Sequence, residues 1–167
     1  ERAEVSLPAA SEALRRRVLK RLAFGAYLWT KLPLAALAGL RVSSLDDESC
    51  TVVLPGGWRT QNPFRSTYFA AQAMAAEMST GAPAMMLVAG VPGSVSLLVR
   101  EIRAVFGKKI VGPSSWVCRD LPAMREVVER AAESGESESF VARSCGYAAD
   151  GTQVAEFEIA WSFKRRG

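Results

Sequence analysis

Hydrophobic and polar residues follow a helical period in the first quarter of this chain. Apolar residues recur three and four positions apart over residues 11–30, and Ser11 is a candidate N-cap. Pro33 ends or kinks this pattern, and a further short turn of helix is expected over residues 32–38. The sequence therefore predicts a helical segment at the N-terminal end.

From Gly39 onward the period changes to two, which is typical of strands that are buried on one face. Strands are predicted over residues 40–43, 50–54, 94–106, 114–120, 137–147 and 152–164. The Asp150-Gly151 pair between the last two strands predicts a hairpin turn. One face of the last strand is expected in the core, and it carries Phe157, Ile159, Trp161 and Phe163.

A run of alanine and methionine interrupts the strands and predicts a helix over residues 66–80. Ser66 and Thr67 are candidate caps, and Gly81 stands where a glycine commonly follows a helix end. A second helical segment is expected over residues 82–89. The small alanine side chains allow strands to pack closely around this helix.

The order of elements predicts an α+β fold in which an antiparallel sheet wraps a central Ala-rich helix. An amphipathic helix that begins near Pro122 is inserted between strands. A length of 167 residues suits one domain. We expect residues 1–38 to pack as a helical segment on a domain formed by residues 39–167.

The absence of histidine restricts the chemistry that the chain can perform. It excludes Ser-His-Asp and Cys-His mechanisms and the common zinc sites, so acid–base work must fall to carboxylates, Tyr, Lys, Ser, Thr or a thiol. Cys50, Cys118 and Cys145 are widely spaced and odd in number. This pattern indicates reduced thiols in a cytoplasmic protein.

The net charge of +4 comes largely from basic clusters at residues 15–21 and 164–166. Basic residues interleaved with aromatics over one face are missing, so nucleic-acid binding is not expected. The apolar stretch from residue 22 to 40 is interrupted by Lys31 and Pro33, which argues against a membrane-spanning helix. The basic helix over residues 11–30 leaves two readings open, contact with a membrane surface or partner and packing over the open side of the sheet.

The segment from Asn62 to Glu77 carries the most specific pattern. An Asn-Pro-Phe-Arg-Ser element precedes the Ala-rich helix, Tyr68-Phe69-Ala70 stands at its start, and Glu77 follows Tyr68 by nine positions. This arrangement resembles the hotdog-fold acyl-CoA thioesterases of the phenylacetate-pathway type, in which Asn precedes a His-Gly-Gly helix start and an acidic residue follows that His by nine positions. It is more similar still to an uncharacterised branch of that superfamily with the same Asn-Pro-Phe-Arg-Ser element. The order of elements matches over residues 39–165.

The resemblance implies a hotdog fold and hydrolysis of an acyl-CoA thioester, with coenzyme A present only as part of the substrate and no metal. Glu77 would act as base or nucleophile, and Asn62 would orient substrate or water. The helix start at Tyr68, with the backbone N–H groups of Phe69 and Ala70, would stabilise the oxyanion. An apolar setting would raise the pKa of Glu77 and make it a better base. Such sites form between subunits in the family, which implies a homodimer or a dimer of dimers.

Plainer roles are open for the same residues. A glutamate near a helix end is commonly a solvated residue, and an Asn before Pro63 is commonly a turn residue. Three basic residues have two alternative roles: they can bind the phosphates of coenzyme A, or they can be exposed loop charges. They are Arg65, Lys108 and Lys109.

The alternative function is that of a non-catalytic acyl-binding or lipid-binding protein on the same fold. In that case the bulky side chains of Tyr68 and Phe69 would close the reactive position at the helix start.

Overall fold

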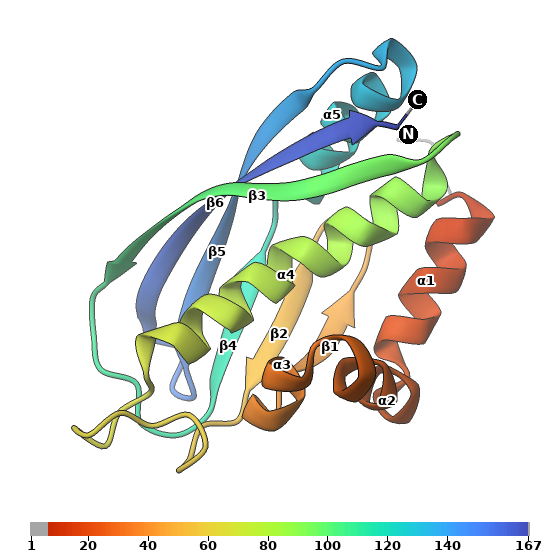
Figure 1. Cartoon of the computed structure of the whole chain (residues 1–167). Coiled ribbons are helices and arrows are strands. Elements are labelled where there is room, and N and C mark those ends of the chain that lie inside the picture. The colour runs from red at the N-terminus through yellow and green to blue at the C-terminus, as the bar shows by residue number, and fades with distance from the viewer. Residues whose placement is uncertain (1–6, 167) are drawn as a thin grey trace, which may run out of the picture.

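The alternating segments form the six strands of one antiparallel sheet in a computed structural model that describes residues 7–166 (Figure 1). The strands lie in the order β1-β2-β4-β5-β6-β3. Their bounds are β1 (Arg41–Leu45), β2 (Cys50–Leu54), β3 (Val95–Phe106), β4 (Ser114–Cys118), β5 (Glu138–Ala148) and β6 (Gln153–Arg165). The sheet curls around one long helix, so the predicted antiparallel α+β architecture is confirmed.

The helices lie on the concave side of this sheet and at its end (Figure 1). Their bounds are α1 (Ala9–Leu19), α2 (Arg21–Lys31), α3 (Pro33–Ala38), α4 (Phe69–Gly90) and α5 (Leu121–Ser134). Within the described part of the chain, no helix is both long enough and apolar enough to cross a bilayer. The two predicted segments cover residues 1–38 and 39–167. Of these, residues 1–6 and 167 lie outside the described residues.

The N-terminal helix predicted over residues 11–30 is two helices, because the backbone of Lys20 is extended between α1 and α2. Ser11 is not an N-cap but lies inside α1, where its hydroxyl donates a hydrogen bond of 2.8 Å to the carbonyl oxygen of Met86. This buried bond joins α1 to α4. The short helix predicted before Gly39 is confirmed as α3.

The central helix α4 is longer than predicted and has 22 residues. The two segments expected over residues 66–80 and 82–89 are one continuous helix, and Gly81 and Pro83 lie in its interior. Ser66 and Thr67 do not cap it, because the N-cap is Tyr68 and no side-chain cap bond forms there. Residues 78–84 are all buried, so packing outweighs the helix cost of about 1 kcal/mol for Gly and about 3 kcal/mol for Pro.

The sheet core contains the predicted face of the last strand, since Phe157, Ile159, Trp161 and Phe163 are all buried. Cys50 and Cys118 lie opposite each other on β2 and β4 as buried free thiols. Burial raises the pKa of both, that of Cys118 to about 12. The edge strand β3 pairs with β6 and not with β4, the next strand in the sequence. Residues 100–106 of β3 are exposed.

Candidate functional site

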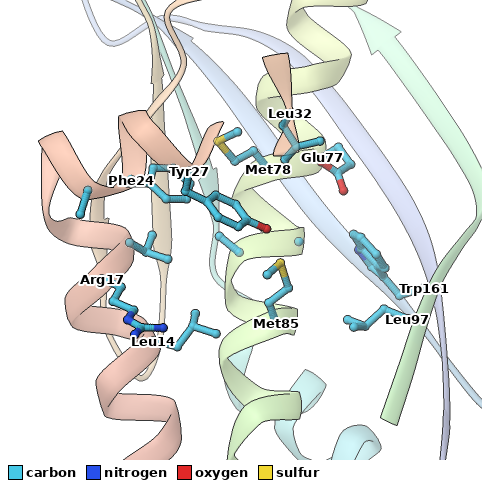
Figure 2. Close-up of a pocket in the computed structure, with 14 residues that line it drawn as sticks. Leu14, Arg17, Phe24, Tyr27, Leu32, Glu77, Met78, Met85, Leu97 and Trp161 are labelled. Carbon is cyan, nitrogen blue, oxygen red and sulfur yellow. The ribbon is translucent and has the colours of Figure 1, made fainter. Parts of the chain in front are cut away.

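A cavity of about 500 Å³ lies between the N-terminal helices, α4 and the sheet (Figure 2). Its walls come from α1, α2 and α4, from the beginning of β3 and from β6. Most of the lining is apolar, including Val18, Phe24, Met78, Ala82, Met85 and Leu97. Three lining side chains can be charged or carry a hydroxyl, namely Arg17, Tyr27 and Glu77.

Glu77 is the one carboxylate among the residues that line this cavity. It lies in the third turn of α4 and is partly buried, and Figure 2 shows its carboxylate on the side of the helix that faces Trp161. Burial raises the pKa of the Glu77 carboxyl, because the charged form loses water without gaining a described cation. The predicted apolar setting of this residue is confirmed, and its reading as a solvated helix-end residue is wrong.

Gly81 makes room for the carboxylate on the surface of the helix. A Cβ atom at this position would lie 2.9 Å from Oε1 of Glu77 and 3.3 Å from the indole of Trp161. The indole N–H of Trp161 donates a hydrogen bond of 3.0 Å to the hydroxyl of Thr80, which donates one of 3.0 Å to the carbonyl oxygen of Glu77. The carboxylate and the indole are thus placed together by the absence of a side chain at residue 81.

The start of α4 has a different character. Tyr68 and Phe69 are 46% and 57% exposed, and their rings meet edge to face with centroids 4.8 Å apart. The first hydrogen bond of the helix is donated by the amide of Ala71 to the carbonyl oxygen of Tyr68, at 3.0 Å. The amides of Phe69 and Ala70 precede that bond and are the free donors that every helix start presents.

One chain does not bring the helix start and Glu77 together. Glu77 follows Phe69 by eight positions, which corresponds to about 12 Å along a helix axis. Tyr68, Phe69 and Ala70 are not among the residues that line the cavity. A single thioester carbonyl therefore cannot contact both groups of the same chain.

Asn62 lies in the loop before α4 and acts there as a turn residue. Its Oδ1 atom accepts hydrogen bonds from the amides of Phe64 and Ser66, at 2.9 and 3.2 Å, and from the Ser66 hydroxyl at 3.2 Å. It does not line the cavity. The structure thus gives Asn62 a role in shaping the loop that leads into the helix.

The three basic residues considered for phosphate binding lie in exposed loops beside the helix start. The loops are joined by a hydrogen bond of 2.9 Å from the Thr67 amide to the Ile110 carbonyl oxygen. The ammonium of Lys109 lies 6.0 Å from the ring centroid of Phe64, and Lys108 is its neighbour. These two lysines and Arg65 are exposed and do not line the Glu77 cavity.

Sequence reasoning missed most of the cavity wall. Arg17, Tyr27, Leu97 and Trp161 come from elements far from α4 in the sequence, and only the folded chain brings them to Glu77. One signal was present, since a glycine inside a strong helix former commonly has a packing reason. Among residues 7–166, no three His, Cys, Asp or Glu side chains lie together in a way that could hold a metal ion.

The chain is similar to known proteins at the level of family and of structure. The model of the family described as a domain of unknown function, DUF4442, matches residues 20–163. No curated protein matches the sequence. A Pseudomonas aeruginosa protein of unknown function, described as a probable thioesterase, shares 20% identity, with 96% of this chain and 99% of that chain covered and a TM-score of 0.69.

Two further solved structures are of variants. A variant thioesterase from Pseudomonas aeruginosa shares 20% identity, with 92% of this chain and 99% of that chain covered and a TM-score of 0.67. A hypothetical protein from Staphylococcus aureus, in which a glutamate is replaced by alanine, shares 13% identity, with 80% and 99% covered and a TM-score of 0.64. A second variant from that species, called a thioesterase enzyme, replaces a glutamine fifteen positions earlier.

Likeness at these identities establishes the fold, and the family model covers most of the chain. The expected hotdog architecture, a sheet wrapped around a central helix, is confirmed by the sheet topology and by the likeness to solved structures. The chain therefore belongs to the DUF4442 family and has the fold of the hotdog thioesterases.

Proposed function

We propose that this protein hydrolyses an acyl thioester, with an acyl-CoA as the substrate and Glu77 as the reacting carboxylate. The observation that carries the proposal is a single carboxylate in an otherwise largely apolar cavity of about 500 Å³. That volume lies within the range of about 300–1,000 Å³ common for small-molecule sites. If a methylene group takes about the 30 Å³ of a water molecule, the cavity holds on the order of a dozen or more carbons.

Burial prepares Glu77 for proton transfer, because a carboxylate with a raised pKa is a stronger base at neutral pH. As a base it would take a proton from water while the water oxygen attacks the thioester carbon. The C–S bond then breaks, the carboxylic acid is released, and the proton passes to the leaving thiolate. As a nucleophile, Glu77 would form an anhydride that water hydrolyses to the same products.

A second copy of the chain would complete this site. The amides at the helix start lie about 12 Å from Glu77 within one chain, whereas an antiparallel α4 of a partner could present its helix start to Glu77. The edge strand β3 supports such a homodimer, since it has an unpaired edge with exposed Leu98, Ile102, Val105 and Phe106.

The loop before α4 would hold the coenzyme A part of the substrate. Asn62 and Glu77 are fifteen residues apart, the same spacing as the glutamine and glutamate replaced in the Staphylococcus aureus structures. This match supports a substrate- or water-orienting role for the Asn62 amide. Arg65, Lys108 and Lys109 would meet the phosphates.

Three free thiols fit a reducing compartment such as the cytoplasm.

The test measures free thiol released from acyl-CoA substrates of increasing chain length by wild type and Glu77→Gln. We expect turnover that Glu77→Gln lowers at least about 100-fold, as loss of a general base commonly does. Glu133→Gln is the matched control, because Glu133 is exposed on α5, and it should behave as wild type. Undiminished turnover in folded Glu77→Gln would contradict the proposal.

A non-catalytic acyl binder is the second candidate, and the exposed rings of Tyr68 and Phe69 at the helix start favour it. These rings stand where substrate would approach the amides. This reading predicts saturable binding of acyl-CoA with no turnover at any chain length. Turnover that depends on Glu77 would exclude it.

A further inference from the structure

The outer faces of α2 and α3 expose large apolar side chains. Leu22 and Trp29 are 90% and 60% exposed and lie seven residues apart on one face of α2. Leu34 and Leu37 are 66% and 49% exposed on α3. The opposite face of α2 is already used, since Leu28 is buried in the core. The helix is therefore apolar on two sides, and the outer one has no partner within residues 7–166.

The charges of this region have one dominant sign. Residues 9–38 carry six basic side chains and one acidic side chain, Glu12. The Glu12 carboxylate already meets Arg15 at 2.9 Å and Arg16 at 3.6 Å. The exposed basic residues that form no ion pair within the described chain are Arg17, Lys20, Arg21 and Lys31. Arg17 lines the cavity, whereas Lys20, Arg21 and Lys31 lie on or next to α2, the helix that carries Leu22 and Trp29.

We propose that the outer faces of α2 and α3 dock on an anionic membrane surface. An interfacial helix combines a buried apolar face containing Trp and Leu with flanking Lys and Arg. Cations close to an anionic leaflet are attracted to its headgroups. The described helices are too short or too polar to span a bilayer, so the contact is peripheral.

Charge separates this occupant from a second copy of the chain. In a two-fold contact the same patch meets itself. Such a contact would bring the basic residues of α1 and α2 against their own copies, and like charges there oppose association. Anionic headgroups complement the same residues. The lipid surface thus fits both the apolar and the charged features.

The docking helix also forms a wall of the cavity. Ala23, Phe24 and Tyr27 of α2 line it, whereas Leu22 and Trp29 face outward. Helix α2 would therefore lie between the lipid and the acyl cavity, which suits ligands that partition into membranes. Membrane binding itself does not depend on hydrolysis, so it can be tested without an activity assay.

The test is flotation of the full chain with vesicles of phosphatidylcholine alone or mixed equally with phosphatidylglycerol. We expect at least about tenfold tighter binding to the mixed vesicles, weakening as salt is raised. Leu22→Glu combined with Trp29→Glu should lower that binding at least about tenfold. The matched control is Val141→Glu, a 56% exposed apolar residue on β5, which should bind as wild type.

Three results would overturn the proposal. The first is equal or no binding to the two kinds of vesicle, and the second is an equal loss of binding in Val141→Glu. The third comes from light scattering in solution without lipid. If wild type is a dimer and the double variant Leu22→Glu and Trp29→Glu is a monomer, this face joins two copies of the chain.

Discussion

Helix α4 contains two regions of opposite character, its start and its third turn. The start has exposed aromatic rings and the free amides of Phe69 and Ala70. The third turn has a partly buried carboxylate, Glu77, against Gly81 and the indole of Trp161. The first region has exposed hydrogen-bond donors, whereas the second has a partly buried carboxylate.

This difference shows why a spacing motif is an incomplete description of a site. The nine-residue interval between Tyr68 and Glu77 places both on one helix. The rise of a helix then keeps them apart, by about 12 Å between Phe69 and Glu77. Chemistry that needs both regions requires two chains, whereas acyl binding needs only the cavity at the third turn.

Filling the cavity should have the largest effect among changes that leave Glu77 itself in place. In Ala82→Phe the ring would occupy space beside Glu77, since Ala82 lines the cavity. If about three methylene groups are excluded at about 0.8 kcal/mol each, kcat/KM for long chains falls on the order of 50-fold. Short-chain substrates should be unaffected. A fall that is equal at every chain length, or the same fall in the exposed control Ala123→Phe, would contradict this location for the acyl chain.

Gly81→Ala should displace the carboxylate without unfolding the helix. The new Cβ would come 2.9 Å from Oε1 of Glu77, so that flexible end must shift. We expect about a tenfold loss in kcat with little change in KM, because misplacing a reacting group by a fraction of an ångström is costly. Gly25→Ala is the control, since a Cβ there meets nothing within 4 Å. It should add up to about 1 kcal/mol to the free energy of unfolding and keep wild-type turnover.

Phe69→Gly tests the helix start. Removing the exposed ring should let a thioester approach the first amides more closely, as glycine permits. We expect turnover to rise roughly two- to fivefold, at a cost of at most about 1 kcal/mol in stability. Trp58→Gly, which removes another exposed ring outside the helix, should leave turnover unchanged. Lower turnover in Phe69→Gly would show that the ring assists binding instead.

The smallest effect concerns stability and pH. Because the pKa of Glu77 is raised in the folded state, the folded chain holds this proton more tightly than the unfolded chain. The free energy of unfolding therefore declines as pH rises from the unfolded pKa, about 4.3, to the folded one. Glu77→Gln removes this decline, and urea unfolding should show it more stable than wild type at pH 7. Equal stability of the two proteins at pH 7 would show that burial does not disfavour the charge.

Much of the fold was predictable because its signals are local. Alternation identified the strands, and the buried face of β6 was correct residue by residue. The end of the central helix was wrong, because the local rule for a glycine after a helix gives way to burial around Gly81. The break at Lys20 has no sequence signal that distinguishes it from its neighbours.

The candidate site was predictable only in part. Glu77 emerged from its spacing along one helix, which is local information. Its surroundings depend on α1 and α2 folding over α4 and on β3 pairing with β6, and these are long-range contacts. Arg17 and Trp161 could not be assigned to the cavity without them.

Single-turnover hydrolysis of dodecanoyl-CoA with enzyme in excess tests the role of Glu77 most directly, because it separates the chemical step from product release. The measurement compares thiol release in wild type and Glu77→Gln, with substrate binding followed in parallel. We expect Glu77→Gln to bind the substrate as wild type does and to release thiol at least about 100-fold more slowly. Equal rates of the first turnover would contradict the assignment of Glu77 as the reacting carboxylate.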